Sequence, residues 1–151
     1  MNLSHYLGLL HRAETELAGA YPEVGEAHAA EVDVFHLTRT LAQQCEAHAE
    51  RLAEFAERYG EEAGEAPERL HAELFAGARS GGLGLLRDLH DLYVMVAQCD
   101  IAWTLVGQAA RGLRDDGLLA VVSACEGETA TQMQWLRTRM KQAAPQALVV
   151  A

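Results

Sequence analysis

Apolar residues recur at alternating steps of three and four along four stretches of the chain, which is the spacing of one face of an α-helix. The first stretch carries one carboxylate among its apolar positions: Leu3, Leu7, Leu10, Glu14, Leu17 and Tyr21. Pro22 removes one backbone donor and is expected to kink this helix without ending it. The second stretch carries a histidine where a leucine is expected, and Gly60 is a suitable stop; its positions are Ala30, Val34, Leu37, Leu41, Cys45, His48, Leu52, Phe55 and Tyr59.

The third and fourth stretches follow a segment of different composition. The third helix is predicted from about Gly84, with Leu89, Leu92, Val96, Cys99, Trp103, Val106, Ala110 and Leu113 on one face. Asp115, Asp116 and Gly117 predict a tight turn. The fourth helix is expected to stop before Pro145, and it presents Leu118, Val122, Cys125, Thr129, Gln132, Leu136 and Met140.

The segment from about 61 to 83 is acidic and then glycine-rich. It predicts a short helix from Pro67 to about Ala76 with loops on both sides. A bundle whose helices alternate up and down needs only about 2 to 8 residues between neighbours. The longer linker favours a crossover that places the second and third helices parallel. We therefore expect one domain, residues 1–151, folded as an all-α four-helix bundle.

Composition and charge narrow the classes of partner. Half of the residues are apolar and the net charge is −10, which argues against nucleic acid or an anionic membrane as a partner. Of the twelve basic residues only Lys141 is a lysine, a bias typical of GC-rich bacterial genomes. Three cysteines on helix faces, no apolar run near 18 residues and no signal-peptide pattern predict a cytoplasmic protein without a disulfide framework.

Four polar side chains are predicted to lie at one height in the bundle. Residues equally far from the turn of a helix hairpin share a level, which pairs Glu14 with His48 and Asp100 with Gln132. Cys45 lies one turn from His48. Buried polar groups of this kind must be hydrogen-bonded, paired or bound to a cation.

Two interpretations of this layer follow. In the first, Glu14 bonds to His48 and Asp100 to Gln132, and the layer only fixes helix register. In the second, carboxylates and imidazole bind iron, manganese or zinc at mid-bundle. Cys45 is also a candidate nucleophile with His48 as its partner, although buried cysteines are usually inert.

The stretches Ala13–Pro22 (AETELAGAYP) and His48–Leu52 (HAERL) resemble the ferritin-like superfamily. The nearest branch is the YciE/YciF-type bacterial stress proteins, whose first two helices carry a similar AE-x-x-L-x-x-A-x-P and H-x-E-R-L. The step from Asp100 to Ala102 is similar to an acidic-Ile-Ala step in their third helix. The resemblance implies a crossover bundle and a di-iron site used for oxidation, peroxide handling or iron storage.

Carried onto this chain, the family's metal site is incomplete. Glu14 matches the first-helix glutamate and His48 the histidine of the second-helix motif. The glutamate expected three residues before that histidine is Cys45, the third helix offers only Asp100, and the fourth offers Gln132. A di-iron centre normally has four carboxylates, so the resemblance implies a degenerate site. A mononuclear site of Glu14, His48 and Asp100, joined by Cys45, is the metal-binding alternative.

The function expected from these features is a non-enzymatic bundle that acts through self-association or a partner, in a role related to stress, with its metal centre lost. The alternative is a metal-binding or redox protein with a reduced Glu/His/Asp site. Trp103, Trp135, Tyr93 and the apolar tail Ala147–Ala151 are the residues expected to form a homodimer surface.

Overall fold

The computed structural model describes residues 1–60 and 73–150, and within them the chain forms long helices and no strand. The prediction of an all-α helical bundle is confirmed. The helices are α1 (Leu3–Ala27), α2 (Val32–Gly60), α3 (Gly81–Leu113) and α4 (Asp116–Pro145), followed by one π-helical segment, η1 (Gln146–Val150). Within residues 1–60 and 73–150, no helix combines the length and the hydropathy that a membrane span requires.

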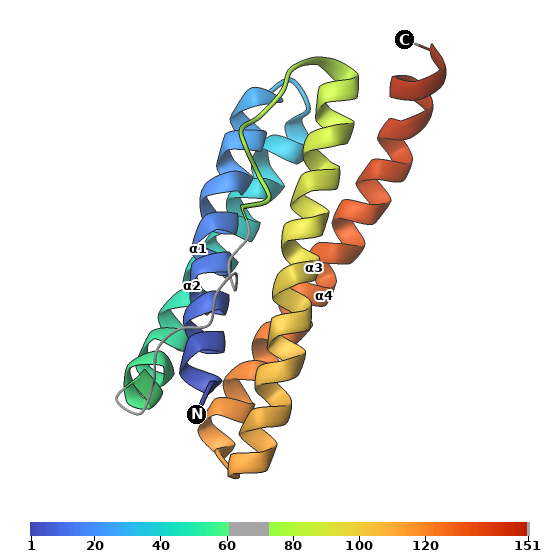
Figure 1. Ribbon diagram of the computed structural model, residues 1–151. Helices are drawn as coiled ribbons and strands as arrows, with labels where there is room; N and C mark the ends of the chain where they lie inside the picture. Colours follow the sequence, from blue (N-terminus) through green and yellow to red (C-terminus); the bar gives the residue numbers. More distant parts are fainter. Residues whose placement is uncertain (61–72, 151) are drawn as a thin grey trace.

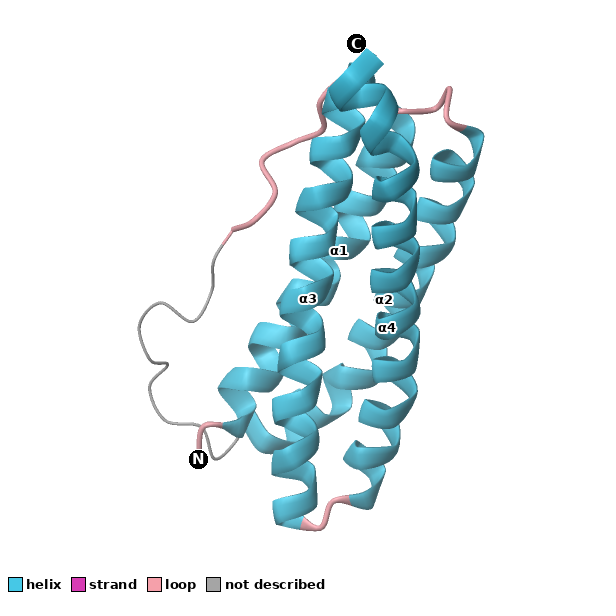
Figure 2. Cartoon of the chain, turned by 90° about the vertical axis from the view of Figure 1, so that its right-hand side faces the viewer, coloured by secondary structure: helices cyan, strands magenta, loops and turns pink. Residues whose placement is uncertain are grey.

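The bundle consists of two helix hairpins that pack side by side (Figure 1). Helix α1 pairs with α2, and α3 pairs with α4. Contacts between α1 and α3 and between α2 and α4 join the two hairpins, and Figure 2 shows the same layers from the side. The C-terminal end of α1 lies beside the start of α3, where His28 contacts Asp88. Helices α1 and α3 are therefore antiparallel, and α2 and α3 run in the same direction.

The core comes from the faces that the spacing predicts. All six predicted positions of α1 are buried, and so are Trp103, Cys125 and Leu136 on the second hairpin. Leu37 and Met140 are only partly buried, and their neighbours Thr38 and Arg139 take the interior positions. The helices thus form because each buries one apolar face against the others, as expected for amphipathic segments of this length.

The hairpin of α1 and α2 is closely packed near its turn. Gly25 faces Thr38, and a Cβ atom built on Gly25 would overlap the Thr38 hydroxyl. That hydroxyl donates to the Val34 carbonyl at 2.7 Å. Pro22 lies inside α1, which continues to Ala27 as predicted.

The hairpin of α3 and α4 turns through a left-handed residue. Arg114 has φ 55°, and the Asp115 N–H donates to the Ala110 carbonyl at 2.9 Å. The Asp115 carboxylate then caps α4 by accepting the Leu118 N–H at 3.0 Å. Arg58, near the end of α2, donates to the same carboxylate. The predicted turn is therefore correct, and α2 helps to fix it.

Three predicted boundaries are wrong. Helix α3 begins at Gly81 and not at about Gly84. Residues 73–80 are not helical, so the short helix predicted from Pro67 does not reach Ala76. The part of that prediction before residue 73 lies outside the described residues. Helix α4 includes Pro145 and continues into η1. Pro145, which has no backbone donor, is the last residue of α4 and directly precedes η1.

Candidate functional site

The centre of the bundle holds the predicted contact between Glu14 and His48. Glu14 is on α1 and His48 on α2, and each side chain is 1% exposed. His48 Nδ1 lies 3.2 Å from Glu14 Oε1. The two residues meet because they are equally far from the short turn between the helices. The prediction that they share a level is confirmed.

The second ring nitrogen of His48 faces another carboxylate. His48 Nε2 lies 3.2 Å from Glu128 Oε1, and the Glu128 side chain is 43% exposed. A carboxylate accepts hydrogen bonds and does not donate them when ionised. Only the imidazolium form can donate from both nitrogens at once. The two contacts therefore fit a protonated His48 ring between two carboxylates. We call the group of Glu14, His48, Trp103 and Glu128 the His48 layer.

Trp103 is the contribution of α3 to this layer. Its indole Nε1 donates to Glu14 Oε1 at 2.9 Å, and the residue is fully buried. The indole ring meets the His48 ring edge-on, with centroids 5.9 Å apart. Trp103 and His48 thus contact the same oxygen of the Glu14 carboxylate, Oε1. Because it is buried, the expectation that Trp103 belongs to a dimer surface is wrong.

Gln132 and Cys45 lie in a neighbouring group one turn away. Gln132 Oε1 accepts from the Tyr21 hydroxyl at 2.9 Å, and the Cys45 thiol lies 3.8 Å from the same oxygen. The Gln132 amide nitrogen donates to Gln44 Oε1 at 3.0 Å. Tyr21 reaches this level because helical side chains point back toward the N-terminus of their helix. The predicted ligands Gln132 and Cys45 therefore contact each other, while Glu14 and His48 contact each other one turn away.

Asp100 does not join the predicted layer. It is partly exposed, and its backbone carbonyl accepts from Thr104. Cys99, the preceding residue, occupies the interior position at 1% exposed. Successive helical residues are rotated by about 100°, so the Asp100 carboxylate is turned away from the interior. The predicted contact between Asp100 and Gln132 is absent from the described hydrogen bonds, and Trp103 takes the place assigned to Asp100.

Burial and charge shift the titration of the groups in and beside the layer. Burial alone would lower the pKa of His48, but hydrogen bonds with Cys125 and Glu14 and the charge of Glu14 raise its pKa to about 10. Burial, followed by the charge of Glu14, raises the pKa of the Cys45 and Cys99 thiols well above the ordinary range. Such thiols are protonated at neutral pH, which argues against Cys45 as a nucleophile.

The donors of the His48 layer do not fit a dinuclear metal centre. Within residues 1–60 and 73–150, no three His, Cys, Asp or Glu side chains are placed to hold one metal ion. Glu14 and Glu128 approach opposite edges of the His48 ring, so an ion bound to one nitrogen would contact only one of them. One atom does have spare capacity: Glu14 Oε2 is buried without a hydrogen-bond partner among the described residues.

A second buried polar cluster lies at the other end of α1 and was not predicted. His28 Nε2 lies 2.7 Å from Asp88 Oδ2, and Asp88 is fully buried. Arg79 donates to Asp88 twice, from its backbone N–H at 2.9 Å and from Nη1 at 2.8 Å, and its Nη1 also reaches Asp91. The cluster joins the end of α1 to the start of α3 and to the segment just before it, which lie about 50 to 60 residues further along the chain. No spacing rule connects such positions.

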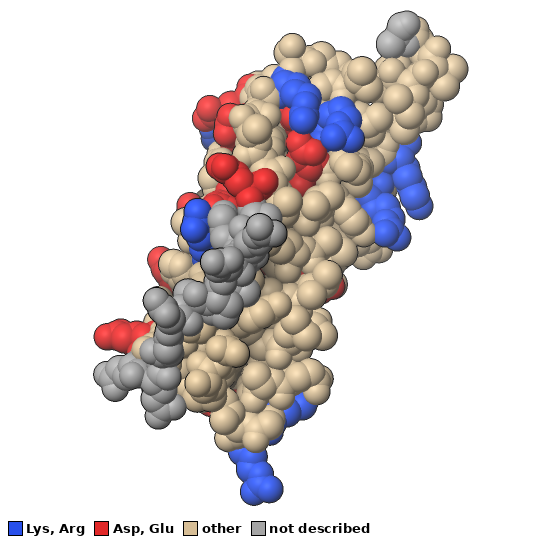
Figure 3. Space-filling view, in the orientation of Figure 1, with Lys and Arg blue, Asp and Glu red and all other residues tan. Residues whose placement is uncertain are grey.

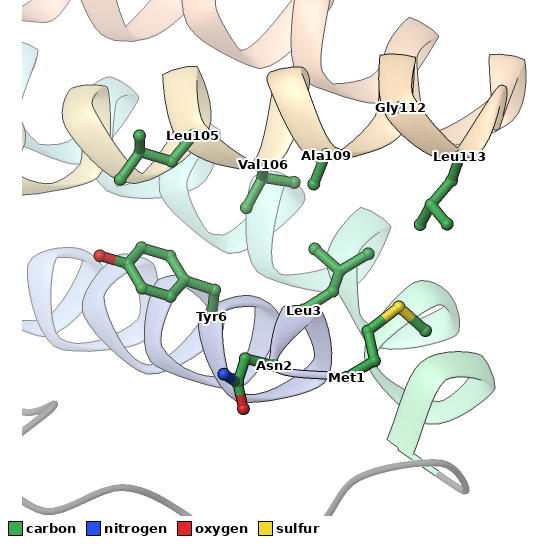
Figure 4. A pocket seen from close by; sticks show the side chains of 9 residues that line it. All are labelled: Met1, Asn2, Leu3, Tyr6, Leu105, Val106, Ala109, Gly112 and Leu113. Atoms are coloured by element: carbon green, nitrogen blue, oxygen red, sulfur yellow. The ribbon is translucent and has the colours of Figure 1, made fainter.

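An apolar pocket of about 500 Å³ opens between the start of α1 and the end of α3 (Figure 4). Tyr6 and Leu3 line one wall, and Leu105, Val106 and Leu113 line the other. A smaller pocket beside it is lined by Leu9, Ile101 and Gln98, among others. In Figure 3 the lower part of the visible face around α3 is largely free of charged side chains. We call this surface, formed by Tyr6, Leu9, Ile101, Leu105 and Leu113, the α1/α3 face.

Comparison of the chain with family models, curated proteins and solved structures gives no match.

Proposed function

We propose that this protein is a ferritin-like bundle that has lost its metal centre and acts without catalysis, through contacts with itself or a partner protein. The proposal includes a crossover between α2 and α3, a bacterial origin and a role related to stress. The parallel direction of α2 and α3 and the contact of Glu14 with His48 support the ferritin-like assignment.

The proposal that the metal centre is lost rests on one observation: a carboxylate oxygen lies 3.2 Å from each ring nitrogen of His48. A metal ligand must present an unprotonated nitrogen to the ion. In this site both nitrogens are engaged as donors, and the imidazolium supplies the positive charge that a metal ion would supply. The two carboxylates are thereby neutralised in part without any ion.

The α1/α3 face supports action through association. Ile101 is 60% exposed and Leu105 is 46% exposed, and both border the apolar pocket or its neighbour. Solvent-exposed large apolar side chains that form one contiguous surface mark interaction sites more often than isolated ones do. Burial, by contrast, holds the Cys45 and Cys99 thiols of the interior protonated, so neither is an activated nucleophile.

Metal analysis of protein purified without chelator tests this proposal. We expect less than stoichiometric iron, manganese and zinc in the wild-type chain. His48→Gln serves as the matched variant, since it retains size and hydrogen bonding but not the imidazole. One equivalent of a transition metal in the wild type, lost in His48→Gln, would contradict the proposal.

Glu14 Oε2 favours a second candidate, a metal-binding or redox protein. A buried carboxylate oxygen without a partner is a free ligand atom, and rotation of Glu128 away from His48 would free a ring nitrogen beside it. In this candidate function, iron, manganese or zinc binds to Glu14 and His48. Titration of the apo protein with Zn²⁺ by calorimetry distinguishes the two, because this candidate predicts saturable one-to-one binding that Glu14→Gln abolishes.

A further inference from the structure

Helix α3 is apolar on two opposite sides. It is the most apolar of the four helices and yet only weakly one-sided. Its inner face is buried in the bundle, but Val94, Ile101 and Leu105 on the outer face are 40%, 60% and 46% exposed. A helix that is apolar all round is normally buried all round. The outer face of α3 therefore lacks a cover among the described residues.

Three apolar residues and one glutamine on the outer side of α3 form a second heptad-like seam. Val94, Gln98, Ile101 and Leu105 are separated by steps of four, three and four. This spacing is the same read in either direction, so the four positions of an antiparallel copy of α3 fall opposite these four positions. A two-fold axis between residues 99 and 100 places Val94 opposite Leu105 of the partner subunit and Gln98 opposite Ile101 of the partner subunit. Such a self-complementary surface is what a two-fold dimer requires.

Among the described residues, only one half of the groove beside this seam is covered. Leu74 and Phe75, in the segment before α3, pack on the core and line a pocket with Glu23 and Met95. Nothing among the described residues covers the half next to Tyr6 and Leu105.

The distribution of charged residues favours a second copy of this chain over other partners at the α1/α3 face. The chain carries a net charge of −10, but residues 1–13 contain no acidic residue and residues 92–110 contain only Asp100. A basic or an acidic partner would find almost nothing to pair with on this face. A second copy brings a surface that is equally poor in acidic residues, with Asp100 as its one carboxylate between residues 92 and 110. Two strongly acidic subunits can approach each other most closely where both lack charge.

We infer that the α1/α3 face is a homodimer interface in which two copies of α3 pack antiparallel about a two-fold axis near residues 99 and 100. This inference rests on the proposed association function and specifies its partner. It differs from the expected dimer surface, because Trp103 is buried and the exposed tail Leu148–Val150 lies at the other end of the bundle (Figure 1).

Site-directed cross-linking tests the pairing. Val94→Cys and Leu105→Cys are prepared as separate variants, and a short bis-maleimide is added to each alone and to an equimolar mixture. The native cysteines are at most 1% exposed and serve as an internal negative control in the wild type. In the antiparallel dimer, residue 94 of one subunit lies opposite residue 105 of the other, eleven residues further along the helix. The two copies of residue 94 are therefore about 16 Å apart along the helix axis, at roughly 1.5 Å per residue.

We expect a covalent dimer from the mixture and almost none from either variant alone. Efficient cross-linking of Val94→Cys alone would indicate a parallel or nonspecific contact and would overturn the inference. Equal yields from the mixture and the separate variants would overturn it as well.

Sedimentation of variants with a new charge gives an independent test. Ile101→Glu places a carboxylate in the seam of each subunit, and we expect the dimer dissociation constant to rise about a hundredfold or more. Val32→Glu is the matched control, because Val32 is 65% exposed on α2 away from this face and should leave the constant unchanged. Leu105→Arg should repeat the effect with the opposite charge. Circular dichroism checks that each variant is folded.

The outcomes separate this inference from the proposed function. A wild-type chain that sediments as a monomer at all concentrations overturns the homodimer, whereas the loss of the metal centre is decided by the metal analysis alone. Dimerisation that Ile101→Glu leaves intact places the interface elsewhere and overturns the inference. A dimer weakened by Ile101→Glu and not by Val32→Glu supports it.

Discussion

His48 and His28 are both buried histidines that contact a carboxylate, but the compensating positive charge has a different source at each. At His48, two carboxylates face one ring, and the ring itself is the cation. At His28, a single carboxylate of Asp88 faces one ring nitrogen, and Arg79 supplies a positive charge to that carboxylate. A neutral His28 ring can make its contact by donating from one nitrogen.

The difference shows that the charge balance at mid-bundle depends on one residue, His48, whereas the charge balance at the bundle end does not depend on His28. Removal of the proton from His48 leaves two anions without compensation, one of them fully buried. At the bundle end, Asp88 keeps a hydrogen-bonded cation whatever the state of His28. The mid-bundle layer is therefore the more sensitive of the two clusters, both to substitution and to pH.

The largest expected effect comes from breaking the buried pair of Glu14 and His48. Glu14→Gln keeps an acceptor for Trp103 but leaves a buried cation with a weaker partner, and removal of one member of a buried ion pair costs about 3 to 5 kcal/mol. We expect the free energy of unfolding, measured with urea, to fall by about this amount.

A double-mutant cycle sharpens this result. His48→Gln should cost about as much as Glu14→Gln, and the double variant should cost less than the sum of the two, because no unpaired charge remains. Strict additivity of the two losses would show that the residues do not interact.

A smaller loss is expected at the other cluster. Asp88→Asn removes a charge but retains one oxygen that can accept from Arg79, and weakening hydrogen bonds to a buried charged group costs about 1.5 to 3 kcal/mol. Thermal unfolding of Asp88→Asn and of Glu14→Gln under the same conditions compares the two losses of stability directly. A larger loss for Asp88→Asn than for Glu14→Gln would reverse the ranking of the two clusters.

The His48 layer also predicts a pH dependence. The folded-state pKa of about 10 lies above the ordinary value of 6.5, so the stabilisation is complete below pH 6.5 and is lost as pH rises toward 10. Between pH 6.5 and 8, before thiols ionise in the unfolded chain, we expect the free energy of unfolding to fall by about 1 to 2 kcal/mol.

The control for this pH dependence is His48→Gln, in which the fall over the same interval should largely disappear. Urea unfolding at several pH values provides the measurement. A wild-type stability that rises over this interval would contradict a protonated His48 in the folded protein.

The smallest effect is expected at the second carboxylate of the layer. Glu128 is 43% exposed, so its charge is largely solvated, and ion pairs of exposed side chains contribute about 0 to 1 kcal/mol. Glu128→Gln should lower the free energy of unfolding by less than about 1 kcal/mol. Equal losses for Glu128→Gln and Glu14→Gln would show that burial does not distinguish the two carboxylates.

The extent to which the sequence predicts this site depends on how the helices are connected. The contact of Glu14 with His48 follows from equal distances to a short turn, which sets the relative height of the two helices. The same rule failed for Asp100 and Gln132, because height does not set rotation, and Asp100 is turned away from the interior position of Cys99. Glu128 lies beside the interior position of Thr129, and its long side chain reaches His48 from there.

Contacts between the two hairpins could not be predicted in this way. Trp103 meets Glu14, and Asp88 meets His28, across an interface whose register is not set by any short turn. Arg139 likewise is buried against Glu31 and Asp33, far from it in sequence. The helices themselves follow from apolar periodicity, and so their faces were predicted well.

The close approach of Gly25 to Thr38 constrains how this sequence can change over evolutionary time. Glycine inside a helix is less favourable than alanine by about 1 kcal/mol of helix stability. A methyl group at position 25 nevertheless has no room while the hydroxyl of residue 38 is present. The better helix former becomes accessible only after Thr38 has been replaced by a residue without that hydroxyl. Alanine at position 25 is therefore expected to be tolerated better when residue 38 is alanine than when it is threonine.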